Sequence, residues 1–207
     1  MSKALRILLI DDHSVMRMGL VSLLETCPEI ASADDAGSGA EGIRKALKSR
    51  PDVVIMDLMM PGMDGVETTR QLIAEWPEAK VLVLTTFGTS DGISRVLEAG
   101  ARGAILKNAE LPDLLAAIQS VAAGKSYLSS EIRQIMKDDP PLPELSPRQI
   151  EIMSSIMRGF SNAEIATQLG IDRSTVKNHL SILFSKLGVS TRAEAVALAL
   201  RKQLLKA

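Results

Sequence analysis

Cysteine, histidine and aromatic residues are scarce in this chain of 207 residues. A single cysteine, Cys27, excludes an internal disulfide and is typical of a reducing compartment. Aromatic residues make up only 2% of the chain, so its cores must be built from aliphatic side chains and methionine. The hydrophobic content of 46% is still enough for well-packed domains.

Long apolar runs are also absent. No stretch reaches the ~18 apolar residues that a membrane-spanning helix needs. The apolar run near the N-terminus is cut short by Asp11 and Asp12, so we expect no secretory signal there. These absences predict a cytoplasmic protein with no membrane partner.

The small net charge of −1 conceals an asymmetry between the two halves of the chain. Residues 1–125 carry 13 Lys and Arg against 17 Asp and Glu, whereas residues 144–207 carry 9 against 5. The chain is long enough for two ordinary domains. We therefore predict one domain over 1–125 with a cation site and a second domain over 144–207 with a polyanionic partner. A linker over 126–143 joins them, with a short helix over about 129–137 and a proline-rich end.

Four short apolar runs in the first half each end at a residue that can handle phosphate. The runs cover 5–10, 53–56, 81–84 and 104–106, and they are followed by Asp11-Asp12, Asp57, Thr85 and Lys107. Helix-like segments separate them, and a weaker strand is expected near 30–34. This alternation predicts an α/β fold with a doubly wound, five-stranded parallel sheet. Ligands bind at the carboxyl ends of such strands, so we expect these side chains to meet.

Three carboxylates, a hydroxyl and an ammonium group at one edge are suited to metal-assisted phosphorylation. Asp12 and Asp57 are placed to bind Mg²⁺ directly, with Asp11 acting through water or as a third carboxylate. Asp57 is central among the strand ends and is the best candidate nucleophile, because a carboxylate can form an aspartyl-phosphate. Thr85 and Lys107 would each contact a phosphoryl oxygen.

The second half predicts four helices, with start signals at Ser146, Ser161, Asp172 and Thr191. Two of them, over about 162–169 and 173–187, form a helix-turn-helix. Along the second of these two helices, residues 176, 180, 183 and 187 make one buried apolar stripe. The opposite face is polar and lightly cationic, as expected of a helix that enters a DNA major groove, and carries Ser174, Lys177, Asn178, Ser181 and Ser185.

These motifs resemble those of bacterial response regulators. The segments IDDH at 10–13, DLMMPGMDG at 57–65, LT at 84–85 and GAILK at 103–107 are similar to a flavodoxin-like receiver domain. The segments LSPRQ at 145–149, GFSNAEIA at 159–166 and TVKNH at 175–179 resemble a LuxR-type DNA-binding domain. The whole chain therefore resembles the NarL/FixJ family.

The resemblance implies a function for each half. In the first half, Asp57 would accept a phosphoryl group from a sensor histidine kinase. Mg²⁺ would be held by Asp12, Asp57 and the main-chain carbonyl of Met59. The protein would be a transcription factor controlled by this phosphorylation, and not a turnover enzyme.

In the second half, the resemblance implies binding to double-stranded promoter DNA. Lys177 and Asn178 would read bases, while Arg173, Thr175 and His179 would position the helix against phosphates. Some relatives carry a second lysine where this chain has Ser181. A final helix over about 191–205 resembles a dimer contact, so we expect a homodimer on DNA.

One position departs from the family pattern. Receivers usually carry Tyr or Phe where this chain has Ala104. The departure favours an alternative function, a DNA-binding regulator that acts without phosphorylation. Two further alternatives are a Mg²⁺-dependent phosphohydrolase acting through Asp57 and a LuxR-type regulator that senses a small ligand.

Overall fold

The computed structural model describes residues 4–86, 89–143 and 145–202. The chain divides into two compact units, Met1–Pro141 and Leu142–Ala207. Each unit is described by itself below. The far end of the helix expected over 191–205 lies outside the described residues.

The first unit is built on one parallel sheet. Its strands are β1 (Leu5–Ile10), β2 (Ile30–Ala36), β3 (Val53–Asp57), β4 (Val81–Thr85), β5 (Gly103–Leu106) and β6 (Tyr127–Leu128). They lie in the order β2-β1-β3-β4-β5-β6, and every pair is parallel. The α/β class is confirmed, but the sheet has six strands where we predicted five. The extra strand, β6, has only two residues, too few to leave a hydrophobic pattern.

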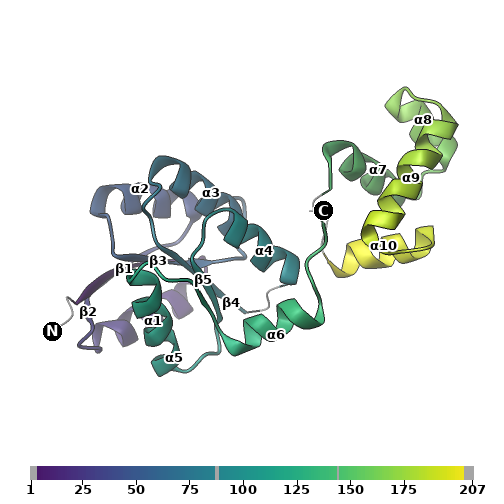
Figure 1. Ribbon diagram of the computed structural model, residues 1–207. Helices are drawn as coiled ribbons and strands as arrows, with labels where there is room; N and C mark the ends of the chain where they lie inside the picture. Colours follow the sequence, from purple (N-terminus) through teal and green to yellow (C-terminus); the bar gives the residue numbers. More distant parts are fainter. Residues whose placement is uncertain (1–3, 87–88, 144, 203–207) are drawn as a thin grey trace. The chain divides into compact units, whose positions relative to one another are not determined.

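Helices cover both faces of this sheet (Figure 1). They are α1 (Ser14–Glu25), α2 (Gly39–Ser49), α3 (Gly65–Glu75), α4 (Ser90–Glu98) and α5 (Leu111–Ala122). Side chains from α2, α3 and α4 share a core with one face of the sheet, and those from α1 and α5 share a core with the other. This double winding leaves the carboxyl ends of the central strands free to carry a site.

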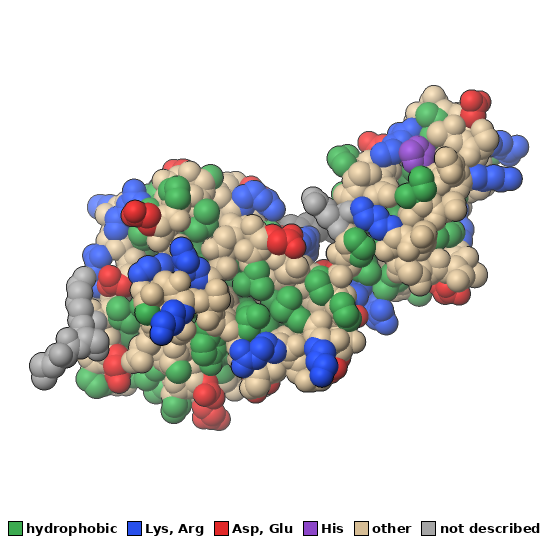
Figure 2. Space-filling view, viewed as in Figure 1, with side chains coloured by type: hydrophobic (Ala, Val, Ile, Leu, Met, Phe, Trp, Pro, Cys, Tyr) green, Lys and Arg blue, Asp and Glu red, His purple; other side chains and the backbone are tan. Residues whose placement is uncertain are grey.

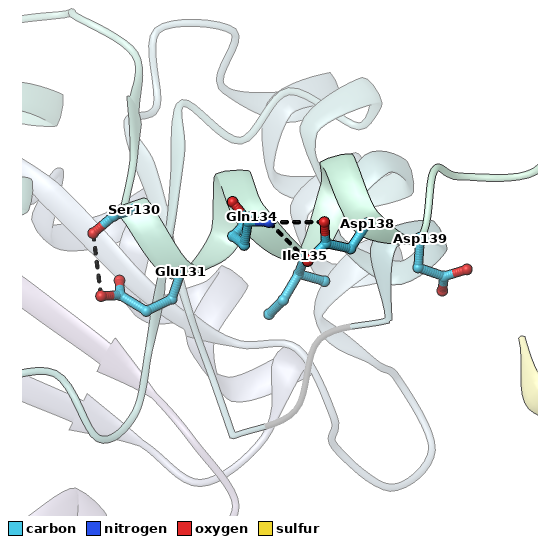
Figure 3. A pocket seen from close by; sticks show the side chains of 6 residues that line it. All are labelled: Ser130, Glu131, Gln134, Ile135, Asp138 and Asp139. Carbon is cyan, nitrogen blue, oxygen red and sulfur yellow. Dashed lines mark hydrogen bonds between the residues drawn. The ribbon is translucent and has the colours of Figure 1, made fainter.

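A short helix, α6 (Ser130–Asp138), completes the first unit. Ile132 of α6 is fully buried in the core that contains α4 and β5. The outer side of α6 is a shallow hollow, in which the Ser130 hydroxyl donates to Glu131 and the Gln134 amide donates to Asp138 (Figure 3). The linker that we predicted over 126–143 is thus mostly ordered structure of the first unit. Its apolar residues pack on the sheet, and only the proline-rich end separates the units.

The second unit is a bundle of four helices, as the fold-class prediction had it: α7 (Pro147–Met157), α8 (Asn162–Leu169), α9 (Arg173–Leu187) and α10 (Arg192–Arg201). Ser146 and Ser161 both form capping boxes. Asp172 occupies the N-cap of α9, but its side chain makes no capping hydrogen bond. Thr191 accepts from the Glu194 backbone, while the Glu194 carboxylate bonds the Ser190 backbone instead of completing a box.

Apolar side chains gather in three cores, two beside the sheet and one in the helical unit. The outer surface of the first unit carries charges of both signs (Figure 2). Basic side chains are also spread over the visible face of the second unit. Among the described helices, none is long and apolar enough to cross a membrane.

Candidate functional site

Lys107 forms ion pairs with two carboxylates at the carboxyl ends of the strands. Its Nζ atom lies 2.7 Å from Asp11 Oδ2 and 2.9 Å from Asp57 Oδ2. Asp11 follows β1, Asp57 ends β3 and Lys107 follows β5, so three separate strands supply these charges. The structure thus brings together residues that are 96 positions apart in the chain, as predicted from the parallel topology.

The local chain holds Asp57 in place. All five residues of β3 are buried, and Asp57 Oδ1 accepts a hydrogen bond from the Met59 backbone at 3.4 Å. The loop then returns to the strand end, where Gly65 N donates to Leu58 O at 3.0 Å. A Cβ atom at Gly65 would lie 2.3 Å from the Asp57 carbonyl oxygen. Glycine is required here because the start of α3 lies directly against the strand that presents Asp57.

Burial makes unbalanced charge in this site energetically costly. Asp11 and Asp57 are at most 2% exposed. Burial raises the pKa of the Asp57 carboxyl, Lys107 opposes this, and Asp11 adds to it. Burial would lower the pKa of Lys107, but its two carboxylate partners outweigh that effect and raise it. One cation faces two anions, so the lysine is fully neutralised while the carboxylates keep an excess of negative charge. Such a site attracts a further cation.

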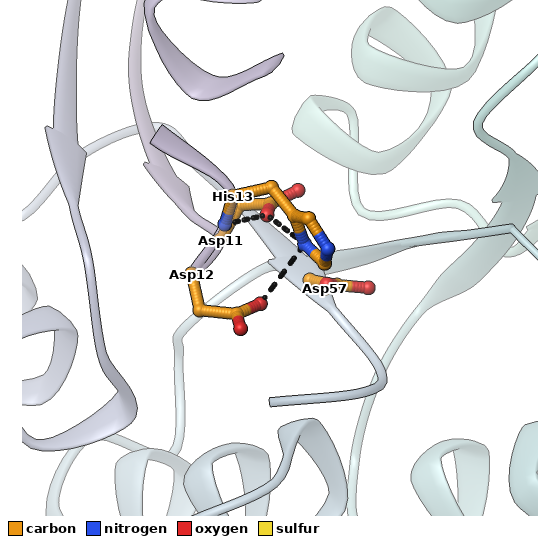
Figure 4. Close-up of side chains that lie close together, drawn as sticks. All are labelled: Asp11, Asp12, His13 and Asp57. Carbon is orange, nitrogen blue, oxygen red and sulfur yellow. Dashed lines mark hydrogen bonds and ion pairs between the residues drawn. The ribbon is translucent and has the colours of Figure 1, made fainter. Parts of the chain in front are cut away.

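The excess charge lies where a metal ion could be held. Ligand atoms of Asp11, Asp12, His13 and Asp57 all lie within 4.8 Å of one another (Figure 4). Asp12 Oδ1 is buried and accepts no hydrogen bond from the residues that the structure describes, although His13 Nδ1 lies 3.1 Å away. A buried carboxylate oxygen without a donor is costly unless a cation satisfies it. The donor set, rich in carboxylate oxygens, fits a hard divalent ion.

His13 occupies the N-cap of α1. Its imidazole also lies 3.4 Å from Asp11 Oδ1, which brings it into the acidic cluster. Its place directly after Asp11 and Asp12 was the only signal for this in the sequence.

Thr85 and Met59 lie next to the charged group. Thr85 ends β4 and is fully buried, and its Oγ1 has no hydrogen-bond partner in the described part of the chain. Its backbone oxygen accepts from the Lys107 backbone at 2.8 Å, which fixes the two residues relative to each other. The Met59 side chain is 59% exposed and comes two residues after Asp57. A buried hydroxyl without a partner is a donor available to a ligand oxygen.

The second unit presents a different kind of surface on α9. Four residues of α9 are buried in the core of the unit, namely Val176, Leu180, Leu183 and Leu187. The remaining face is exposed and slightly hollowed, and the hollow is lined by Ser174, Thr175, Lys177, Asn178 and Ser181. Arg173 is also exposed, whereas His179 is half-buried at the edge of this face. The structure therefore gathers five of the candidate DNA-contacting residues around one hollow of α9, with Arg173 and His179 outside it.

One further residue of this face was not predicted. Ile182 of α9 is 52% exposed, although isoleucine usually lies in a core. In the sequence, only the polar residues of this face indicated DNA binding, and an isoleucine within an amphipathic helix is usually assigned to the core.

Comparison with known proteins assigns both units. Residues 7–119 match the family model for the response regulator receiver domain. Residues 143–199 match that for bacterial regulatory proteins of the luxR family. The chain is 39% identical to the transcriptional regulatory protein LiaR of Bacillus subtilis, over 97% of this chain and 99% of the relative. The chain belongs to the NarL/FixJ family of response regulators.

Other relatives of this response regulator agree. It is 39% identical to a nitrate/nitrite response regulator protein homolog of Haemophilus influenzae, over 96% of this chain and 97% of that protein. It is also similar to the crystal structure of ChrA, a response regulator of a haem-sensing two-component system. That likeness has a TM-score of 0.57 and 37% identity, and covers 97% of this chain and 98% of the other.

The atypical residue of this response regulator, Ala104, lies inside the fold. It is fully buried on β5, beside Val83 on one side and Leu128 on the other. It shares a core with Ile132 of α6, whose N-cap residue Ser129 donates its backbone N–H to the Ala104 carbonyl oxygen at 3.2 Å. Apolar residues of α6 therefore pack into the core around a small side chain on β5.

Proposed function

We propose that this response regulator is switched by phosphorylation of Asp57 and reads promoter DNA with α9. The observation that carries the proposal is the position of Lys107, which lies between the buried carboxylates of Asp11 and Asp57. A half-buried lysine between two buried carboxylates leaves net negative charge beside a nucleophilic oxygen, and that arrangement suits phosphoryl transfer better than a purely structural ion pair.

In the proposed reaction, a carboxylate oxygen of Asp57 attacks the phosphorus of a phosphohistidine on a sensor kinase. The new O–P bond forms as the N–P bond breaks, and the imidazole leaves with the bonding electrons and takes up a proton. Lys107 then pairs with a phosphoryl oxygen in place of its bond to Asp57. The Thr85 hydroxyl, which has no partner in the described chain, donates to a second oxygen.

Asp11, Asp12, Asp57 and the main-chain carbonyl of Met59 would hold Mg²⁺. When bound, this ion offsets negative charge on the transferred group. The buried Asp12 oxygen without a hydrogen-bond donor supports its role as a ligand. Asp11 is already bonded to Lys107 and to the His13 backbone, so its contribution fits an indirect contact through water.

For DNA, we propose that the exposed face of α9 enters the major groove. Lys177 and Asn178 would contact base edges, because their side chains have donors and acceptors that match purines. Arg173, Ser174, Thr175, His179 and Ser181 would contact phosphates or flanking bases. α10 would pair two copies of the chain on DNA, so that the recognised site has two halves.

In this proposal, the protein is a phosphorylation-controlled switch and not a turnover enzyme. It acts in the cytoplasm, where the kinase and promoter DNA are both accessible. Release of inorganic phosphate from small phosphoesters over many turnovers by the purified chain would contradict this part of the proposal.

The test compares the wild-type chain with Asp57→Asn. We expect Mg²⁺ and acetyl phosphate to add one phosphoryl group to the wild type, seen as a gain of about 80 Da in intact mass. The variant should gain none, because its amide is not a nucleophile. A DNA titration with and without phosphorylation then measures the coupling. Equal labelling of the variant would exclude Asp57 as acceptor.

A second function is favoured by one observation, the methyl side chain of the buried Ala104. Because Ala104 has no aromatic ring, no large side chain at this position of β5 can change its orientation when Asp57 is phosphorylated. This favours DNA binding that does not depend on phosphorylation. Equal affinity for DNA before and after complete labelling of Asp57 would support this alternative.

A further inference from the structure

Ile182 is an apolar side chain on a surface that is otherwise polar. In the described part of the second unit, the large hydrophobic side chains that are well exposed are Ile150, Ile182 and Leu200. A single exposed apolar residue often has no role. Ile182 differs because it lies on α9 among the residues that we propose to contact DNA.

Helix geometry places Ile182 on that face, beside Asn178. With 100° per residue, Ile182 lies about 40° around the axis from Asn178 and about one turn, roughly 6 Å, further along. It is about 50° from the direction opposite the buried stripe, whereas Lys177 is about 90° from it. A helix docked so that Lys177 and Asn178 reach bases would bring Ile182 to the same groove.

The chemistry of Ile182 selects what it would meet there. Its side chain has no donor or acceptor, so it gains nothing from the polar edges of guanine, adenine or cytosine. The major groove carries one apolar group, the C5-methyl of thymine. Burying a methyl group against isoleucine removes apolar surface of both from water.

We propose that Ile182 is a specificity-determining residue that reads the C5-methyl group of a thymine in each half-site. This inference rests on the proposed DNA binding by α9. It adds an apolar contact to the polar contacts of Lys177 and Asn178, and it makes thymine at one position part of the recognised sequence.

The experiment uses the full chain and begins with selection of preferred duplexes from a random library. In the selected duplex, each thymine is then replaced in turn by uracil, which differs only in lacking the methyl group. For the wild type, we expect one thymine per half-site whose replacement weakens binding about threefold to fourfold, the value of one buried methyl-sized group. For Ile182→Ala, the same replacement should have no effect.

Ile150→Ala is the matched control, because Ile150 is the same residue type in the same unit and is 42% exposed on α7. It should keep the wild-type response to uracil. If Ile182→Ala responds to every uracil as the wild type does, the proposal is wrong. The proposal is also wrong if sedimentation shows that Ile182→Ala changes the oligomeric state of the DNA-free protein, since Ile182 would then lie in an interface between copies of the chain. Failure of the wild type to enrich any sequence would instead contradict the proposed DNA binding itself.

Discussion

The acidic site of the first unit and the α9 face of the second differ in how their polar groups are satisfied. Asp11 and Asp57 are buried, and both are bonded to the half-buried Lys107 before any ligand arrives. Lys177 and Asn178 are exposed to water. A buried site must be held together by its own ion pairs, whereas an exposed face depends on its partner for order and for binding energy.

This difference indicates in which region a substitution should change both folding stability and function. Changes in the acidic site should alter both folding and chemistry, because each charged group there is part of the packing. Changes on the α9 face should alter only DNA binding. Four pairs of substitutions test this contrast, in order of decreasing effect.

Lys107→Met should cause the largest loss. It leaves two buried carboxylates without their cation, which we expect to lower the free energy of unfolding by about 3 kcal/mol and to abolish phosphorylation. Urea unfolding in chelator measures the first effect, and adding Mg²⁺ should restore more stability to the variant than to the wild type. Lys45→Met is the control, since its partners Asp34 and Glu41 are well exposed and its loss should cost at most about 1 kcal/mol.

Asn178→Ala should weaken specific DNA binding by about 2 kcal/mol, roughly thirtyfold, without changing the urea midpoint. Arg173→Ala should weaken binding to all sequences alike and lower the slope of log affinity against log salt by about one, as expected for a lost phosphate contact. Titrations at several salt concentrations distinguish the two. If Asn178→Ala lost stability but kept specificity, the contrast between the two regions would fail.

Gly65→Ala tests the packing that presents Asp57. A Cβ atom 2.3 Å from the Asp57 carbonyl oxygen forces the strand end or α3 to shift, at a cost of about 2 kcal/mol, and should slow phosphorylation. Gly19→Ala is its counterpart within α1, where no atom of residues 4–86, 89–143 and 145–202, apart from the adjacent residues and the nearby helix backbone, lies within 4 Å of the added Cβ. That change should stabilise the protein by up to about 1 kcal/mol and leave the labelling rate unchanged. A similar stability for both variants would show that the close approach at Gly65 is not a constraint.

Ser161→Ala should have the smallest effect, about 1 kcal/mol of unfolding free energy, because it removes a complete capping box. Asp172→Ala should cost clearly less, since the Asp172 side chain makes no capping hydrogen bond. Thermal unfolding of the pair, read as a difference in Tm, measures this. The reverse order would mean that the two helix starts are not distinguished by their caps.

Much of the fold was readable from local patterns. Apolar runs of strand length gave the positions of β1, β3, β4 and β5, because a buried parallel strand is continuously hydrophobic. The capping boxes at Ser146 and Ser161 lie where the sequence predicted them, since their hydrogen bonds involve only four consecutive residues.

Non-local features were less readable. The helix expected over about 129–137 is present as α6, but we placed it in the linker, although Ile132 is fully buried against the sheet. Its short amphipathic pattern is compatible with either role, and only the space beside β5 selects packing. β6 escaped prediction for the same reason, since two residues form a strand only where an open sheet edge offers them partners.

The sequence by itself determined the order of strands and helices, the residues at the strand ends and the apolar stripe of α9, because each depends on neighbours within one or two turns. Tertiary structure alone decided that one lysine faces two buried carboxylates, that His13 joins them, that α6 packs beside Ala104 and that Ile182 stays in water. Those outcomes depend on which segments, distant in the sequence, pack together. The free energy of burying a charge or an apolar side chain is set by these tertiary neighbours.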